Sequence, residues 1–242
     1  MPRFYLPQAL TANQTLTLPD TLVRHIQVLR AQPGDVIELF DGHGQVYQAA
    51  ILSMGKKSVS VSVQAAATVL CESPLPITLL QSVSSSERMD FTIQKSVELG
   101  VAQIVPLMSE RSSQRLSGER ADKKVARWQD IAIAACEQCG RTVVPTIAPI
   151  ISLAEALNRL PENGTRLLMS LNRPQALNQL PTPPAATLLV GPEGGFSAAE
   201  EALAISQFGF NGISLGPRVL RTETAALAAI AAMQMLWGDF TV

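Results

Sequence analysis

At 242 residues the chain is long enough for one large domain or two smaller ones with a real hydrophobic core. The net charge of −1 gives no overall basic field of the kind that marks many RNA-binding proteins. Three cysteines are too few for a disulfide scaffold and odd in number, which favours a reducing cytoplasm.

No segment suggests a membrane or secretory protein. The N-terminus has no apolar stretch typical of a signal peptide. The longest apolar helical stretch, 224–237, is shorter than the roughly 20 residues that cross a bilayer. We therefore expect a soluble, cytoplasmic protein.

The first part of the chain reads as short strands separated by turns. Residues 36–40 and 45–52 are apolar-rich runs on either side of an Asp-Gly-His-Gly turn, and 58–64 alternates as SVSVSVQ, the pattern of a half-buried strand. A short helix is expected over 21–30, with His25 packed in the core. These elements predict a small barrel or an open sheet.

A proline-rich break at Ser73-Pro74-Leu75-Pro76 predicts a boundary between a domain of residues 1–72 and one of residues 73–242. Beyond it, 77–83 reads as a buried strand, 87–100 as a helix that ends at a glycine, and 101–108 as a second strand. This β-α-β order predicts a parallel sheet with a right-handed crossover. The second domain is therefore α/β.

The next segments continue the strand–helix alternation. We expect helices over 120–140 and 153–160 and a strand over 166–170. Cys136 and Cys139 fall inside the first of these helices, where no second cysteine pair or nearby histidine completes a metal site, so we expect ordinary helix residues and no metal. Six basic residues between 111 and 127 form either a solvated helix face or a surface for RNA phosphates.

Two glycine-containing loops near the C-terminus are the most informative part of the sequence. Residues 188–190 predict a buried strand that ends in the loop Gly-Pro-Glu-Gly-Gly of 191–195, and Ser197 with Glu200 forms a capping box that starts a helix. A second unit repeats this plan. Its strand ends at Leu215-Gly216, and its helix begins with Thr222 as the N-cap.

Loops at the carboxyl ends of strands are where open α/β sheets bind ligands. Neither the dinucleotide pattern G-x-G-x-x-G nor the P-loop pattern occurs in these loops. Glycines permit positive φ and let the backbone come close to a bound molecule. The two loops together therefore predict a binding site that recognises its ligand by shape and through backbone peptide groups. A single loop of this kind would indicate only a tight turn.

The stretches VGPEGGFSAAE and LGPRVLRTETA resemble the RsmE family of ribosomal RNA uridine-N3 methyltransferases, within the SPOUT superfamily. The resemblance extends to 3–5 (RFY), 25–30 (HIQVLR), 94–101 (QKSVELGV) and 137–145 (EQCGRTVVP). It implies a PUA-like β-barrel that binds RNA, followed by a trefoil-knotted methyltransferase domain. It also implies S-adenosylmethionine as methyl donor and a homodimer that acts on N3 of one uridine in small-subunit (16S) ribosomal RNA.

The resemblance assigns residues to each role. The expected cofactor-binding residues lie in three loops: Met169, Ser170 and Leu171; Gly191, Pro192, Glu193, Gly194 and Gly195; and Leu215, Gly216, Leu220 and Thr222. The expected RNA contacts are Arg3, Arg24, Arg30, Arg111 and Arg115. Part of the alanine-rich final helix is expected to meet a second subunit.

Methylation of a uridine N3 requires loss of its proton, which leaves negative charge on the ring. Arg221, which precedes a helix N-terminus, suits stabilisation of that charge, and Glu223 suits the role of base. Arg221 could equally pair with Glu223 or Glu193 and brace its loop. Glu223 could equally complement the helix dipole.

Two other functions stay open at this point. One is a methyltransferase of the same superfamily that acts on transfer RNA. The other is a non-catalytic RNA-binding dimer, against which the two cofactor-shaped loops argue.

Overall fold

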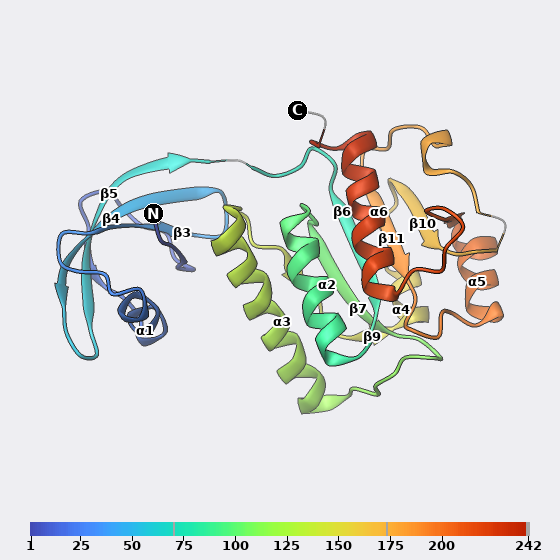
Figure 1. Cartoon of the computed structure of the whole chain (residues 1–242), viewed down its shortest axis with the longest axis horizontal. Coiled ribbons are helices and arrows are strands. Elements are labelled where there is room, and N and C mark those ends of the chain that lie inside the picture. The colour runs from blue at the N-terminus through green and yellow to red at the C-terminus, as the bar shows by residue number, and fades with distance from the viewer. Residues whose placement is uncertain (70, 173, 241–242) are drawn as a thin grey trace. The chain divides into compact units, whose positions relative to one another are not determined.

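The computed structural model describes residues 1–69, 71–172 and 174–240. These residues form two compact units (Figure 1). The first consists of Met1–Glu72 together with Cys136–Val144, and the second of Ser73–Ala135 together with Pro145–Val242.

The first unit is built on a five-stranded sheet. Its strands are β1 (Arg3–Tyr5), β2 (Thr15–Thr17), β3 (Val36–Phe40), β4 (Gln45–Met54) and β5 (Val59–Thr68), in the order β1-β3-β4-β5-β2. The expected alternation of β5 is confirmed, since Val59, Val61 and Val63 are buried and the serines between them are partly exposed. The β1–β3 pair is parallel, whereas β3–β4, β4–β5 and β2–β5 are antiparallel.

Helix α1 (Asp20–Val28) packs Leu22, Val23 and Ile26 into the core of this unit. The expectation that His25 is a core residue is wrong, because it lies on the outer side of α1 and is exposed. The edge of its ring still contacts Phe4, with the ring centroids 5.5 Å apart.

The segment Cys136–Val144 completes the first unit from a distant part of the chain. The guanidinium of Arg3 binds Glu38 and donates to the carbonyl of Gly140. The backbone N–H of Tyr5 donates to Glu137 Oε1 at 3.0 Å. Val143 forms isolated bridges to Gly42 and His43.

The second unit contains a seven-stranded parallel sheet. Its strands are β6 (Ile77–Ser82), β7 (Gln103–Met108), β8 (Thr146–Ile147), β9 (Ile151–Ser152), β10 (Thr165–Met169), β11 (Ala186–Val190) and β12 (Asn211–Ile213). Their order is β12-β10-β11-β6-β7-β8, with β9 beside β7, and the expected parallel pairing of β6 with β7 is confirmed. β12 ends two residues before the predicted end at Leu215.

Helices cover both faces of this sheet (Figure 1). They are α2 (Ser86–Glu98), α3 (Gly118–Cys139), α4 (Leu153–Asn158), α5 (Ala198–Phe208) and α6 (Thr222–Trp237), with a 3-10 turn η1 at Leu177–Gln179. Leu80, Leu168 and Leu189 of the sheet pack against side chains of α4 and α5. Helices α2 and α6 pack side by side.

Helix α6 is buried along one face only, although its sequence is apolar nearly all round. Ala226, Ala229 and Ile230 are fully buried, whereas Met235 and Leu236 are 53% and 44% exposed in the single chain. In the described part of the chain, no helix is long and apolar enough to cross a membrane.

Candidate active site

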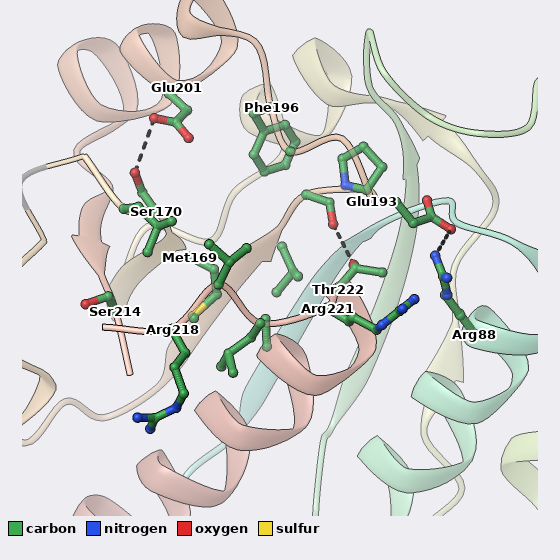
Figure 2. Close-up of a pocket in the computed structure, with 18 residues that line it drawn as sticks. Arg88, Met169, Ser170, Glu193, Phe196, Glu201, Ser214, Arg218, Arg221 and Thr222 are labelled. Atoms are coloured by element: carbon green, nitrogen blue, oxygen red, sulfur yellow. Dashed lines mark hydrogen bonds and ion pairs between the residues drawn. The ribbon is translucent and has the colours of Figure 1, made fainter. Parts of the chain in front are cut away.

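A pocket of about 390 Å³ opens at the carboxyl ends of β10 and β11 and beside the loop that follows β12. This is the edge of a parallel sheet at which ligands bind. Figure 2 shows 18 residues that line it. They come from the start of α2, from the end of β10, from the Gly191–Phe196 loop, from α5, and from 214–225.

The Gly191–Phe196 loop is held in a shape that larger residues would disturb. A Cβ on Gly191 would lie 3.2 Å from the backbone nitrogen of Phe196, so the loop folds closely on itself there. Gly195 has φ of +67°, a conformation that L side chains rarely adopt. β11 is buried throughout, and the predicted capping box of Ser197 and Glu200 is confirmed. The loop is therefore fixed at both ends.

Thr222 connects this loop to α6. Its hydroxyl donates to the carbonyl of Gly191 at 2.6 Å and accepts from Gln81 Nε2 at 3.0 Å. The prediction that Thr222 is the N-cap is wrong, because the cap position is Arg221, and Thr222 is the first helical residue. The threonine hydroxyl therefore links the start of α6 to β6 and to the loop after β11, and it does not cap its own helix.

Arg88 was not expected from the sequence, yet it lies between the two glutamates of the site. Its Nη1 donates to Glu193 Oε1 at 2.9 Å, and its Nε is 3.7 Å from Glu223 Oε1. Burial opposes ionisation of Glu193, but hydrogen bonds from the backbone N–H groups of Ser85 and of Glu193 itself, together with the Arg88 guanidinium, outweigh it and lower the pKa of this carboxyl. Glu193 is therefore a stable anion at the pocket.

The alternative role of Arg221 is an ion pair with Glu193 or Glu223 that braces its loop. The structure does not show this pair, because both glutamates pair with Arg88. Both Arg218 and Arg221 are exposed and line the pocket (Figure 2). Within the described residues, neither forms an ion pair or donates a hydrogen bond. Their positive charges are thus available to an anion in the pocket.

Part of the pocket lining is apolar. It contains Met169, Leu171 and Leu220, and Leu171 is 60% exposed. Ser170 donates to Glu201 Oε2 at 3.2 Å and accepts from the backbone N–H of Asn172. The Ser170–Glu201 pair links the end of β10 to α5 (Figure 2).

Most of the predicted cofactor residues are brought together here. Those that line the pocket are Met169, Ser170, Leu171, Gly191, Pro192, Glu193, Gly195, Leu220, Thr222 and, from the catalytic prediction, Arg221. Gly194, Leu215, Gly216 and Glu223 are near in sequence but are not among the lining residues. The pocket is also lined by Arg88, Glu201 and Ser214, which are not among the predicted site residues. Of these three, only Glu201 has a signal in the sequence, because it follows Glu200 of the capping box.

The arginines expected to contact RNA have different environments. Arg111 Nη1 donates to the carbonyls of Gly194 and Phe196, at 3.0 and 3.4 Å, so it holds the glycine loop from outside. Arg115 donates to two backbone carbonyls of its own loop. Arg3 is bound within the first unit, as described above, whereas Arg24 and Arg30 are exposed.

The cysteines form no metal site. Cys136 is buried in α3, whereas Cys139, the last residue of that helix, is exposed. Burial raises the pKa of Cys136 to about 12, so its thiol stays protonated. Among the described residues, no cluster of histidine, cysteine and carboxylate side chains could hold a metal ion.

Comparison with known families agrees with this geometry. Residues 71–234 match the family described as "RNA methyltransferase domain", and residues 18–64 match "RNA methyltransferase PUA domain". A parallel sheet with a glycine-lined pocket, preceded by a PUA-like sheet, thus defines an RNA methyltransferase.

Individual relatives narrow the class. The chain is 38% identical over 243 residues to ribosomal RNA small subunit methyltransferase E of Buchnera aphidicola subsp. Schizaphis graminum, with 100% of this chain and 98% of the relative covered. A structure of that enzyme from Neisseria gonorrhoeae bound to S-adenosyl methionine is 53% identical, covers 99% of both chains and has a TM-score of 0.96. A methyltransferase from Legionella pneumophila with bound cofactor is 39% identical, again over 99% of both chains, with a TM-score of 0.95. The chain belongs to the RsmE family of ribosomal RNA small-subunit methyltransferases.

Proposed function

We propose that this chain transfers a methyl group from S-adenosylmethionine to N3 of a uridine in small-subunit ribosomal RNA. The observation that carries the proposal is the pocket itself, which is lined by a glycine loop and by two arginines, Arg218 and Arg221, that pair with no carboxylate among the described residues. Structures of two relatives hold this cofactor.

The residues of the pocket fit the cofactor. Gly191 and Gly195 leave the peptide groups of their loop accessible, and Met169, Leu171 and Leu220 provide apolar surface for a flat base. We assign the backbone of this loop to hydrogen bonding with the adenine. When bound, S-adenosylmethionine supplies an electrophilic methyl group, so the protein needs neither a covalent intermediate nor a metal and acts by positioning and electrostatics.

Arg221 is the residue that we assign to the uridine. As N3 loses its proton, negative charge spreads over the ring, and a guanidinium at a helix N-terminus stabilises that charge. Glu223 is the candidate acceptor of the proton. Its Oε2 is buried and accepts no hydrogen bond within the described residues, so this oxygen has free capacity.

Arg221→Ala tests the assignment. We expect turnover to fall roughly 10²- to 10³-fold, the effect of deleting one donor to a developing anion, with cofactor affinity nearly unchanged. Arg221→Lys keeps the charge but loses the planar fork and should retain part of the activity. Single-turnover methylation of small-subunit RNA and calorimetric titration of the cofactor provide the two readouts. A parallel loss of affinity and rate would make Arg221 a structural residue, and methylation of transfer RNA alone would reject the ribosomal substrate.

The remaining proposals concern assembly. We infer that the predicted domain of residues 1–72 is a PUA-like RNA-binding barrel and that residues 73–242 form the catalytic domain. We also infer that exposed Arg24 and Arg30 contact RNA phosphates. We further infer a trefoil knot in the catalytic domain and a homodimer that covers the exposed apolar residues of α6. A ribosomal substrate places the protein in the cytoplasm.

A further inference from the structure

The three cysteines of the chain all lie in the first unit, although they come from two distant segments. Cys71 is near the end of the segment Met1–Glu72, whereas Cys136 and Cys139 belong to the segment Cys136–Val144. None of the three is among the described residues that line the pocket of the second unit. Their thiols are therefore available for chemistry other than methyl transfer.

Two hydrogen bonds align these segments in opposite directions. The Thr142 hydroxyl donates to the carbonyl of Val69, and the Cys71 thiol donates to the carbonyl of Gly140 at 3.3 Å. The Cys71 sulfur atom therefore lies beside the residue that directly follows Cys139. A disulfide requires Cα atoms within about 6.8 Å of each other, a separation typical of residues that are opposite or one step removed in antiparallel chains.

An ion pair next to the thiols holds the two segments in this arrangement. The Arg141 guanidinium binds the carboxylate of Glu72, with Nε 3.1 Å from Oε1, and the Arg141 side chain is only 6% exposed. A pair that is shielded in this way is screened little by salt. Glu72 follows Cys71, and Arg141 is two residues beyond Cys139, so the ion pair limits how far these two cysteines can separate.

Cys136 is a poorer partner for either of the other thiols. It is fully buried, and its thiol donates to the carbonyl of Val143 at 3.7 Å. Burial raises the pKa of this thiol to about 12, so it does not form the thiolate that reacts with oxidants. Cys71 and Cys139 are exposed and can be reached by a small oxidant.

We propose that Cys71 and Cys139 form an oxidative modification site, at which hydrogen peroxide joins them in a disulfide. One thiolate attacks an oxygen atom of the peroxide and becomes a sulfenic acid, while the O–O bond breaks and the other oxygen leaves as water. The second thiolate then attacks this sulfur atom, so that the S–S bond forms and the sulfenic oxygen leaves as a second water. Two electrons pass from the sulfur atoms to the peroxide, and both thiol protons end in water. The disulfide locks the segment Cys136–Val144 onto the rest of the first unit.

Peptide mapping of the full-length protein tests this site. The reduced protein is exposed to hydrogen peroxide, its remaining thiols are alkylated, and it is digested with trypsin and a glutamate-specific protease. Cleavage after Glu137 separates Cys136 from Cys139, so each possible disulfide gives a different linked peptide. We expect a single link between Cys71 and Cys139, an alkylated Cys136, and the return of all three thiols after treatment with dithiothreitol.

Serine variants and thermal unfolding provide the controls. Cys71→Ser and Cys139→Ser should each abolish the intramolecular link, whereas Cys136→Ala is the matched control and should form it as the wild type does. The link joins positions that are 68 residues apart, and a closed loop of this length restricts the unfolded chain. Oxidation should therefore raise the Tm of the wild type by about 5–10 °C and leave the Tm of Cys71→Ser unchanged.

Several outcomes would overturn the inference. A link between Cys136 and Cys139, a disulfide that forms only between two molecules, or oxidation of the thiols to sulfinic acid without pairing would each do so. A linked protein whose Tm does not rise would also overturn it, because the bond would then not stabilise the native arrangement. These measurements use neither cofactor nor RNA, so their result is independent of the proposed methyltransferase activity.

Discussion

Thr222→Val tests how the glycine loop is held, because it removes one hydroxyl and preserves the shape of the side chain. Thr222 is 5% exposed, and its hydroxyl bonds both the Gly191 carbonyl and Gln81 Nε2. Gln81 keeps its bond to the Ser82 carbonyl, but within the described residues Gly191 loses its donor. A buried acceptor left unpaired costs about 1–3 kcal/mol.

We take the lower part of this range, about 1–2 kcal/mol, because Gly191 is only partly buried. For a chain of this size that corresponds to a fall in Tm of about 2–8 °C. Gly191 lines the pocket, so cofactor affinity should fall as well. Thermal unfolding by circular dichroism measures the first effect, and calorimetric titration with S-adenosylhomocysteine measures the second.

Thr224→Val is the control, because it makes the same substitution two residues later in α6 at an exposed position. We expect its free energy of unfolding to stay within about 0.5 kcal/mol of the wild-type value. Equal losses in the two variants would show that replacing a threonine of α6 by valine lowers stability in itself, and that the two hydrogen bonds of the Thr222 hydroxyl do not determine the result. A lower Tm with unchanged cofactor affinity would show that the hydrogen bond between Thr222 and Gly191 stabilises the fold but does not affect cofactor binding.

Two further predictions follow from backbone shape and from burial. Gly191→Ala should lower cofactor affinity because the added Cβ would lie 3.2–3.3 Å from the backbone of the loop. Gly194→Ala should bind the cofactor normally, because the nearest neighbour of its Cβ would be the Arg111 side chain at 3.6 Å. Equal affinities of the two variants would contradict the close folding of the loop at Gly191. A disulfide reagent at pH 8 should modify Cys71 and Cys139 in the folded protein but reach Cys136 only after denaturation, since Cys136 is buried and its pKa is raised to about 12. Rapid reaction of all three thiols would show that the end of α3 opens.

The elements and loops of the catalytic domain could be predicted from sequence because their signals are local. The buried strand at 188–190 and the capping box of Ser197 and Glu200 depend on residues within a few positions of one another, and both are confirmed. The cap of α6 could not be predicted in the same way. Thr222 has the chemistry of an N-cap, but a carbonyl 31 residues away uses its hydroxyl.

Charged residues were the least predictable part of the site. The partner of Glu193 is Arg88, 105 residues earlier, and no local pattern indicates a pair between the first turn of α2 and the loop after β11. Arg111 belongs to a basic segment that reads as an RNA surface, yet its guanidinium binds the carbonyls of Gly194 and Phe196. Charge in a sequence indicates what a side chain can bind, but tertiary contacts decide which partner it has.

The discontinuity of the first unit has a consequence for synthesis of the chain. Its sheet is complete in sequence by Thr68, but the carbonyl bound by Arg3, the carboxylate bound by the Tyr5 amide and the bridge to Gly42 all come from Cys136–Val144. Domains generally fold in order as they leave the ribosome. This unit cannot make those contacts until residue 144 has emerged, after β6, α2, β7 and α3 of the second unit have already been made. The first unit is therefore completed only after part of the second has been synthesised, although its last residue, Val144, still precedes β8 and every later element of the second unit.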